Sequence, residues 1–90
     1  MKRVHVFYSG NVQGVGFRYT VQDIAAKLGV AGWVKNLEDG RVEIVAEAEE
    51  KNLNEFLDKI LKGALGRYIK NIDATQEEPI KEFKDFDIRL

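Results

Sequence analysis

Residues 30–47, VAGWVKNLEDGRVEIVAE, have the pattern of a β-hairpin and set the frame for the rest of the chain. Asp39-Gly40 marks the turn, because this dipeptide tolerates the positive φ that tight hairpins need. The pattern predicts one strand over Val30–Lys35 and a return strand over Arg41–Glu47. The return strand has an alternating apolar face made by Val42, Ile44 and Ala46. The hairpin therefore predicts a sheet with one buried face.

A helix is predicted on each side of this hairpin. The first covers roughly Arg18–Leu28, with Gly29 at the place of a left-handed C-terminal cap. Its apolar residues recur at the i, i+3, i+4, i+7 spacing of one helical face: Val21, Ile24, Ala25 and Leu28. The second helix ends at Gly63. It has an unbroken apolar stripe of Leu53, Phe56, Leu57, Ile60 and Leu61.

Further strands are predicted towards both ends of the chain. Arg3–Ser9 is one, and Gly66–Thr75 is another whose broken alternation indicates a bulge near Lys70-Asn71. The polar segment Gln76–Glu82, with the single proline Pro79, is predicted as a loop before a short closing strand within Phe83–Leu90.

The order of these elements defines the expected fold class. It is α+β, a ferredoxin-like βαββαβ sandwich with an added final strand. Its sheet is expected to be antiparallel, with four to five strands and two helices on one face. Ninety residues suffice for one such unit, so residues 1–90 are expected to form a single domain.

Composition excludes several classes of function. The net charge is -1, so a nucleic-acid partner is not expected. The chain has no cysteine and one histidine, which excludes thiolate catalysis and argues against a metal site. No cofactor is expected. No apolar run is long enough to span a membrane or form a signal peptide. We therefore expect a cytoplasmic, monomeric enzyme or binding module.

The glycine-rich segment Gly10–Arg18, GNVQGVGFR, joins the first strand to the first helix. Glycines let such a loop curl so that backbone N–H groups converge at a helix N-terminus, which favours an anion. Arg18 adds a charged planar fork that matches phosphate oxygens. The alternative is a tight loop with an incidental exposed arginine. Glycine spacing alone favours that alternative, because the P-loop and dinucleotide-binding patterns are absent.

Asn36 lies where the first hairpin strand enters its turn. In the expected fold this strand lies close to the first strand, so Asn36 can reach the mouth of the glycine-rich loop. A neutral amide both donates and accepts hydrogen bonds, which suits it to orient a water molecule. The alternative is that Asn36 shapes the turn by bonding to nearby backbone, and taken alone this residue favours that role.

The segments VQGVGFR (12–18) and GWVKNLEDGRVE (32–43) together resemble the acylphosphatase family. The resemblance extends over nearly the whole chain. It implies a five-stranded ferredoxin-like sandwich that hydrolyses acyl phosphates to carboxylate and inorganic phosphate. It also implies that Arg18 and the backbone amides of Gly14, Val15, Gly16 and Phe17 bind the phosphate, and that Asn36 holds the attacking water. Related modules occur within larger enzymes that handle carbamoyl phosphate.

This reaction is compatible with a chain that has few catalytic side chains. The leaving carboxylate has a conjugate acid with a pKa near ~4, so no strong general acid is needed. Phosphoryl transfer passes through a loose transition state, in which positioning and charge neutralisation supply most of the catalysis. A phosphate oxygen of the substrate is a candidate acceptor for the proton of the water, since no side chain is an obvious base.

The other residues whose side chains could bind a substrate or a metal are expected to have no catalytic role. His5 is expected to be structural or solvent-facing, and Trp33 to be a packing residue. Arg41 and Lys35 are expected to be solvated charges beside the hairpin. The acidic set Glu47, Glu49 and Glu50 is expected to open the second helix rather than to bind a metal.

Binding modules with the same topology are the competing class. An RNA-recognition domain needs stacking aromatics on its central strands, but residues 41–47 have none. Heavy-metal chaperones need paired cysteines. A non-catalytic phosphate-binding or regulatory ferredoxin-like module is the alternative that stays open, and phosphate-release assays separate it from a hydrolase.

Overall fold

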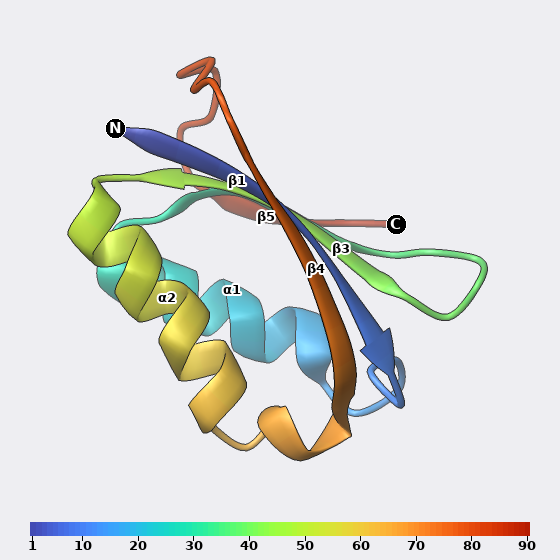
Figure 1. Cartoon of the computed structure of the whole chain (residues 1–90). Helices are drawn as coiled ribbons and strands as arrows, with labels where there is room; N and C mark the ends of the chain where they lie inside the picture. The colour runs from blue at the N-terminus through green and yellow to red at the C-terminus, as the bar shows by residue number, and fades with distance from the viewer.

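The computed structural model describes all 90 residues and has five strands, two helices and a short 3₁₀ turn (Figure 1). The strands are β1 (Lys2–Gly10), β2 (Ala31–Asn36), β3 (Val42–Ala48), β4 (Ile69–Glu77) and β5 (Phe86–Arg89). The helices are α1 (Phe17–Leu28) and α2 (Glu50–Lys62), and the 3₁₀ turn η1 is Gly66–Tyr68. Each predicted helix and strand is therefore present, with its ends shifted by one to a few residues.

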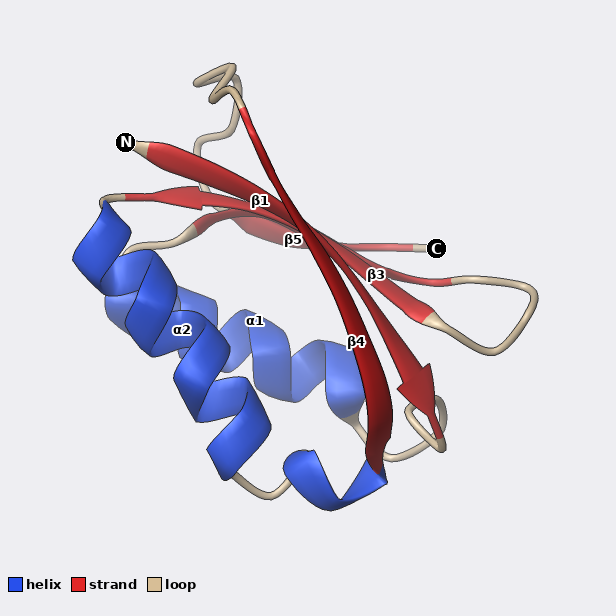
Figure 2. Cartoon of the chain, in the orientation of Figure 1, coloured by secondary structure: helices blue, strands red, loops and turns tan.

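The five strands form one sheet in the order β4-β1-β3-β2-β5. Both helices cover the same face of this sheet (Figure 2). Neighbouring strands are antiparallel except β5, which runs parallel to β2. The ferredoxin-like fold is confirmed, with a mixed sheet rather than a wholly antiparallel one. Neither helix is long and apolar enough to cross a membrane.

The core fills the space between the helices and the sheet. The alternating residues Val4, Val6 and Tyr8 of β1 are buried and face the helices' apolar sides. The stripe of α2 places Leu53, Phe56 and Ile60 in this core. Leu61 lies at the margin of the core and is 47% exposed, because the apolar stripe of α2 is wider than the part of the helix that packs on the core. Burial of these side chains stabilises the fold by about 1.5–3 kcal/mol each.

The two helix-terminating glycines differ in conformation. Gly29 has φ 67° and ψ 32°, which is the left-handed cap expected after α1. Gly63 also ends its helix, but its φ of -85° is not left-handed, so it caps α2 in an extended conformation instead.

The predicted bulge lies in β4. Ser9 of β1 pairs with Asn71, whereas Gly10 pairs with Ile69, so Lys70 is the extra residue. The same strand continues further than the sequence pattern indicated, because Glu77 pairs with Arg3 of β1. The loop predicted for residues 76–82 consequently begins at residue 78.

Candidate active site

Residues 11–16 connect β1 to α1 and are called the glycine loop below. Gly14 and Gly16 have φ of 80° and 78°, a left-handed conformation that glycine adopts without strain. Val12 is fully buried in the core and anchors the start of the loop. The loop is therefore a turned segment whose backbone is fixed at one end by packing.

The N-terminus of α1 follows this loop and lacks a cap from its own side chains. Gly16 is the N-cap residue, no side chain caps the helix, and the first turn has no acidic residue. Phe17 is buried against Tyr8, with their ring centroids 5.3 Å apart, which fixes the helix on the sheet. The first amides of a helix have no intrahelical acceptor, so this end of α1 is suited to an anion.

Arg18 lies in this first helical turn and is half-buried. The chain has five arginines. Four of them contact a carboxylate or an aromatic ring, namely Arg3, Arg41, Arg67 and Arg89. Arg18 has no such partner. A cation at the positive end of a helix is unfavourable unless an anion offsets it, so Arg18 and the helix end favour the same ligand.

Asn36 is the last residue of β2 and pairs with Val42 of β3. Its side-chain oxygen Oδ1 is buried and has no hydrogen-bond partner within the protein. The turn is instead closed by Asp39, whose Oδ1 accepts from the Arg41 amide at 3.1 Å. An unpaired buried acceptor costs about 1–3 kcal/mol. The Oδ1 of Asn36 therefore does not shape the turn through a hydrogen bond to nearby backbone.

A cleft of about 270 Å³ brings the predicted residues together. It is lined by Val12, Gly14, Gly16, Phe17, Arg18, Tyr19 and Asn36. Val15 is not part of the lining, because its side chain packs against the core. The strand β3 lies between β1 and β2, so the two motifs meet across one strand.

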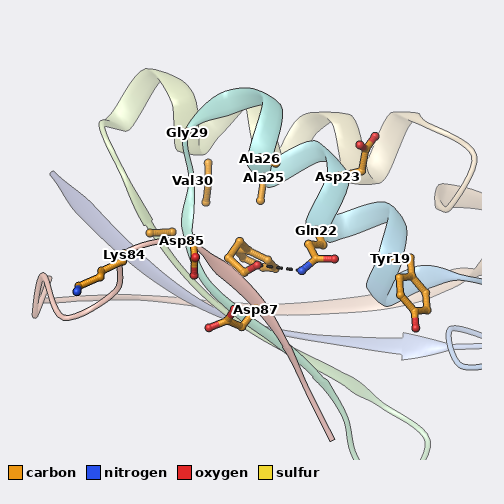
Figure 3. A pocket seen from close by; sticks show the side chains of 12 residues that line it. Tyr19, Gln22, Asp23, Ala25, Ala26, Gly29, Val30, Lys84, Asp85 and Asp87 are labelled. Atoms are coloured by element: carbon orange, nitrogen blue, oxygen red, sulfur yellow. Dashed lines mark hydrogen bonds between the residues drawn. The ribbon is translucent and has the colours of Figure 1, made fainter.

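A larger groove of about 750 Å³ lies between α1 and β5 (Figure 3). Its lining carries three carboxylates, Asp23, Asp85 and Asp87, and one amine, Lys84. Gln22 lies within it and donates from Nε2 to the carbonyl of Phe86 at 3.1 Å (Figure 3). This charge balance repels a phosphate, so the smaller cleft is the better anion site.

His5 and Trp33, for which the sequence predicts structural roles, both contact neighbouring side chains away from the cleft. His5 Nε2 lies 2.6 Å from Glu43 Oε2, and His5 Nδ1 lies 3.2 Å from Glu77 Oε2. Trp33 packs under the guanidinium of Arg89, whose Cζ lies 4.5 Å from the ring centroid. None of these residues lines the cleft.

Glu47 corrects one expectation. It does not open α2 but lies in β3, 2% exposed, where its carboxylate pairs with Arg3 at 2.9 Å. It also accepts hydrogen bonds from the amides of Ile80 and Lys81, at 2.8 and 3.0 Å. Burial raises the pKa of Glu47, and these hydrogen bonds outweigh it, so the pKa lies below its ordinary value. Glu49 and Glu50 are the residues that begin the helix.

Arg41 lies beside the hairpin as a partly exposed charge, which agrees with the expectation. Its Nε lies 2.8 Å from Asp39 Oδ2, and its guanidinium stacks on Phe7 at 4.6 Å from the ring centroid. It therefore contacts the hairpin while its charge still faces the solvent. Lys35 is half-buried and forms no ion pair.

Gln13 is a residue near the cleft that the sequence pattern did not point to. Its side-chain amide bonds the carbonyls of Leu37 and Arg41 in the hairpin turn. A long polar side chain among glycines was the available signal, but its partners are about 25 residues away and only the fold reveals them.

The chain is similar to known proteins over nearly its whole length. The acylphosphatase family model matches residues 4–88. The chain belongs to the acylphosphatase family. An acylphosphatase of Listeria monocytogenes serotype 4b (strain F2365) is 52% identical over 81 residues, covering 89% of this chain and 87% of that protein. The crystal structure of acylphosphatase from Bacillus subtilis superposes with a TM-score of 0.92 at 40% identity, covering all of both chains.

The acylphosphatase fold also occurs inside a longer protein. Full-length HypF, solved in a phosphate- and nucleotide-bound form, matches 98% of this chain with 12% of its own length, at a TM-score of 0.88 and 36% identity. The relatives of similar length identify this chain as an acylphosphatase, a hydrolase that acts on small-molecule acyl phosphates.

Proposed function

We propose that Arg18 and the backbone amides of residues 14–18 bind the phosphoryl group of an acyl phosphate, and that Asn36 orients the attacking water. One observation carries this proposal. The cleft contains a half-buried arginine without a partner and a buried amide oxygen without a partner. A phosphate beside a water molecule satisfies both groups.

The phosphoryl group is bound by charge and by a converging backbone. The guanidinium of Arg18 presents parallel N–H donors that match two phosphate oxygens. The amides of Gly14, Val15, Gly16 and Phe17 supply further donors at the end of α1. Val15 contributes through its backbone alone, since its side chain faces the core.

The water is held by the other side of the cleft. Asn36 Oδ1 accepts a hydrogen bond from the water, whose oxygen then attacks phosphorus. The bond between phosphorus and the carboxyl oxygen breaks, and the electron pair leaves with the carboxylate. The proton of the water goes to a phosphoryl oxygen, so the dianionic substrate and water become a carboxylate and a dihydrogen phosphate anion.

No strong general acid or base is required for this step. The carboxylate is a good leaving group because its conjugate acid has a pKa near ~4. The loose transition state keeps its negative charge on the phosphoryl oxygens, where Arg18 and the amides already lie. Catalysis thus depends on positioning and on preorganised positive charge, without a metal or other cofactor.

The proposal also covers the oligomeric state of the protein and its location in the cell. All the residues assigned to phosphate and water come from one chain, which supports a monomer made of one catalytic domain over residues 1–90. The moderate net charge of -1 and ordinary composition support a cytoplasmic enzyme without a nucleic-acid partner. Sedimentation at assay concentration tests the monomer, and cell fractionation tests the location.

The Arg18→Gln variant tests the phosphate site. We expect it to abolish benzoyl phosphate hydrolysis and competitive inhibition by inorganic phosphate, with the circular dichroism spectrum and melting temperature unchanged. The matched control is Arg67→Gln, because Arg67 stacks on Tyr68 away from the cleft and should be dispensable. Assays run in EDTA, in which the wild type should remain active. Retained activity in Arg18→Gln would disprove the assignment.

A further inference from the structure

Gln13 joins the two segments that form the cleft. Its Nε2 donates one hydrogen bond to the carbonyl of Leu37 at 2.7 Å and another to the carbonyl of Arg41 at 2.9 Å. Both hydrogens of the side-chain amide are then in use. Leu37 and Arg41 flank the turn that directly follows Asn36. One side chain of the glycine loop therefore spans the base of this turn.

The turn that Gln13 grips is bonded within itself. The amide of Leu37 donates to the carbonyl of Arg41 at 2.8 Å, and the amide of Gly40 donates to the carbonyl of Leu37 at 3.2 Å. Hydrogen bonds from the amide and the guanidinium of Arg41 hold the pKa of Asp39 below its ordinary value. The turn is thus a defined anchor for a bond arriving from outside it.

No other hydrogen bond connects the glycine loop to residues 36–41. The strands that lead into these segments, β1 and β2, both pair with β3, where Tyr8 and Asn36 each lie opposite Val42, so the sheet fixes where the loop and the turn begin but not how they lie beyond the strand ends. The loop is otherwise bonded on its far side, where the amide of Asn11 donates to the carbonyl of Tyr68 at 3.0 Å. Beyond these strand ends, the spacing between the loop and the turn depends on the two hydrogen bonds of Gln13 and on packing.

We propose that Gln13 is a positioning residue for the hydrolysis. It sets the distance between the phosphate held by the glycine loop and the water held by Asn36, without touching either. This inference rests on the proposed roles of Arg18 and Asn36. Hydrolysis needs the water in line with the phosphorus, and a misplacement of about 1 Å costs on the order of 10²-fold in rate.

The Gln13→Met variant tests this role, because methionine keeps the length of the side chain and removes both donors. We expect kcat for benzoyl phosphate to fall about 10- to 100-fold. Inhibition by inorganic phosphate should stay within about 3-fold of the wild type, because the groups that bind phosphate remain. An unchanged kcat, or a loss explained entirely by weaker phosphate binding, would overturn the proposal.

Gln22→Met is the matched control. Gln22 also donates to a distant backbone carbonyl, but it lies in the groove between α1 and β5 (Figure 3). Its substitution should leave kcat within about 2-fold of the wild type, as expected for a polar bond away from the reacting atoms. An equal fall of kcat in both variants would show that any lost anchor of this kind lowers turnover, and would overturn a special role for Gln13.

A double variant separates this proposal from the proposed function. If Gln13 acts through Asn36, Gln13→Met should lower kcat far less in an Asn36→Ala background than in the wild type. Equal losses in both backgrounds would show an independent role and overturn the inference. If Asn36→Ala alone kept wild-type kcat, the role proposed for Asn36 would fail, and the positioning role would fail with it.

A shorter side chain covers the case in which Gln13→Met does not fold. Gln13→Asn keeps the amide and withdraws it by one methylene, so it can reach at most one of the two carbonyls. We expect kcat to fall below the wild-type value, again with phosphate inhibition retained. Wild-type kcat in a folded Gln13→Asn protein would contradict the proposal.

Discussion

Two loops of this chain are each held by one side chain, with opposite chemistry. Gln13 donates two hydrogen bonds from a neutral amide to the carbonyls of the turn beyond Asn36. Glu47 accepts two hydrogen bonds with a buried carboxylate, from the amides of Ile80 and Lys81 in the loop before β5. One is a neutral donor at the cleft, and the other is a charged acceptor elsewhere.

The two loops lie at opposite ends of the sheet. Lys2 pairs with Ala48 at one end of the ladder between β1 and β3, and Tyr8 pairs with Val42 at the other. The loop after β4 lies near the N-terminus of the chain, whereas the glycine loop and the hairpin turn lie at the far end of β1 (Figure 1). Changes at one end can therefore be tested against the other as an internal control.

The two anchors should respond differently to pH, because the carboxylate of Glu47 can be protonated and the amide of Gln13 cannot. An amide does not titrate, so the hold of Gln13 on the turn is the same at any working pH. A carboxylate loses its hydrogen bonds and its ion pair with Arg3 when it is protonated. We therefore expect the Glu47 end to govern acid stability and the cleft end to govern turnover.

The largest effect is expected from Asn36→Ala at the cleft. Loss of one positioned polar group in an active site typically lowers kcat by ~10²–10³-fold. Stability should stay constant or rise slightly, because the substitution removes a buried oxygen that has no partner in the protein. Steady-state kinetics and thermal melting check both parts. A clear fall in melting temperature would show that Asn36 is a structural residue.

A smaller effect, on stability alone, is expected from Glu47→Gln at the other end. The glutamine has one acceptor oxygen for two amides and no charge for Arg3, so unfolding should become easier by about 2 kcal/mol. For a domain of this size that lowers the melting temperature by roughly 10 °C. Glu55→Gln, on an exposed part of α2, is the control and should melt like the wild type. A loss of kcat at a temperature where Glu47→Gln is folded would contradict the separation.

The pH dependence of the same variant sharpens this prediction. Glu47 has a lower pKa in the folded chain than its ordinary value, so the folded state binds fewer protons than the unfolded state in that range. Its contribution is complete above an ordinary glutamate pKa of about 4.3 and is lost as the pH falls through the folded pKa. The stability gap between wild type and Glu47→Gln should close below about pH 4. Denaturant unfolding at several pH values measures it.

The elements predicted from the sequence are those whose signal is local. The apolar stripe of α2 and the Asp39-Gly40 turn each depend on neighbours within a few positions. The bulge at Lys70 was also visible, because a break in the alternation of a strand has no other simple cause. The position of the glycine loop between a strand and a helix was local as well, but its glycine spacing alone favoured an incidental role for Arg18, and the phosphate-binding role came from the family resemblance.

The features that the sequence did not reveal all depend on distant partners. Glu47 sits among acidic residues that suit a helix start, and its partners Arg3 and Ile80 lie more than 30 residues away. The parallel pairing of β5 with β2 follows from the path of the chain and not from a local pattern. Gln13 belongs to this group, since its two acceptors lie in a turn 24 and 28 residues further on.

The most direct test of the account is a titration of the ¹⁵N-labelled protein with inorganic phosphate, followed by NMR. We expect the shifts to concentrate at the amides of residues 14–18 and at the side-chain amide of Asn36. The amides of Ile80 and Lys81 should stay unchanged, as should Ala26 and Gly29 in the groove between α1 and β5. Shifts concentrated in that groove, with residues 14–18 unaffected, would contradict it.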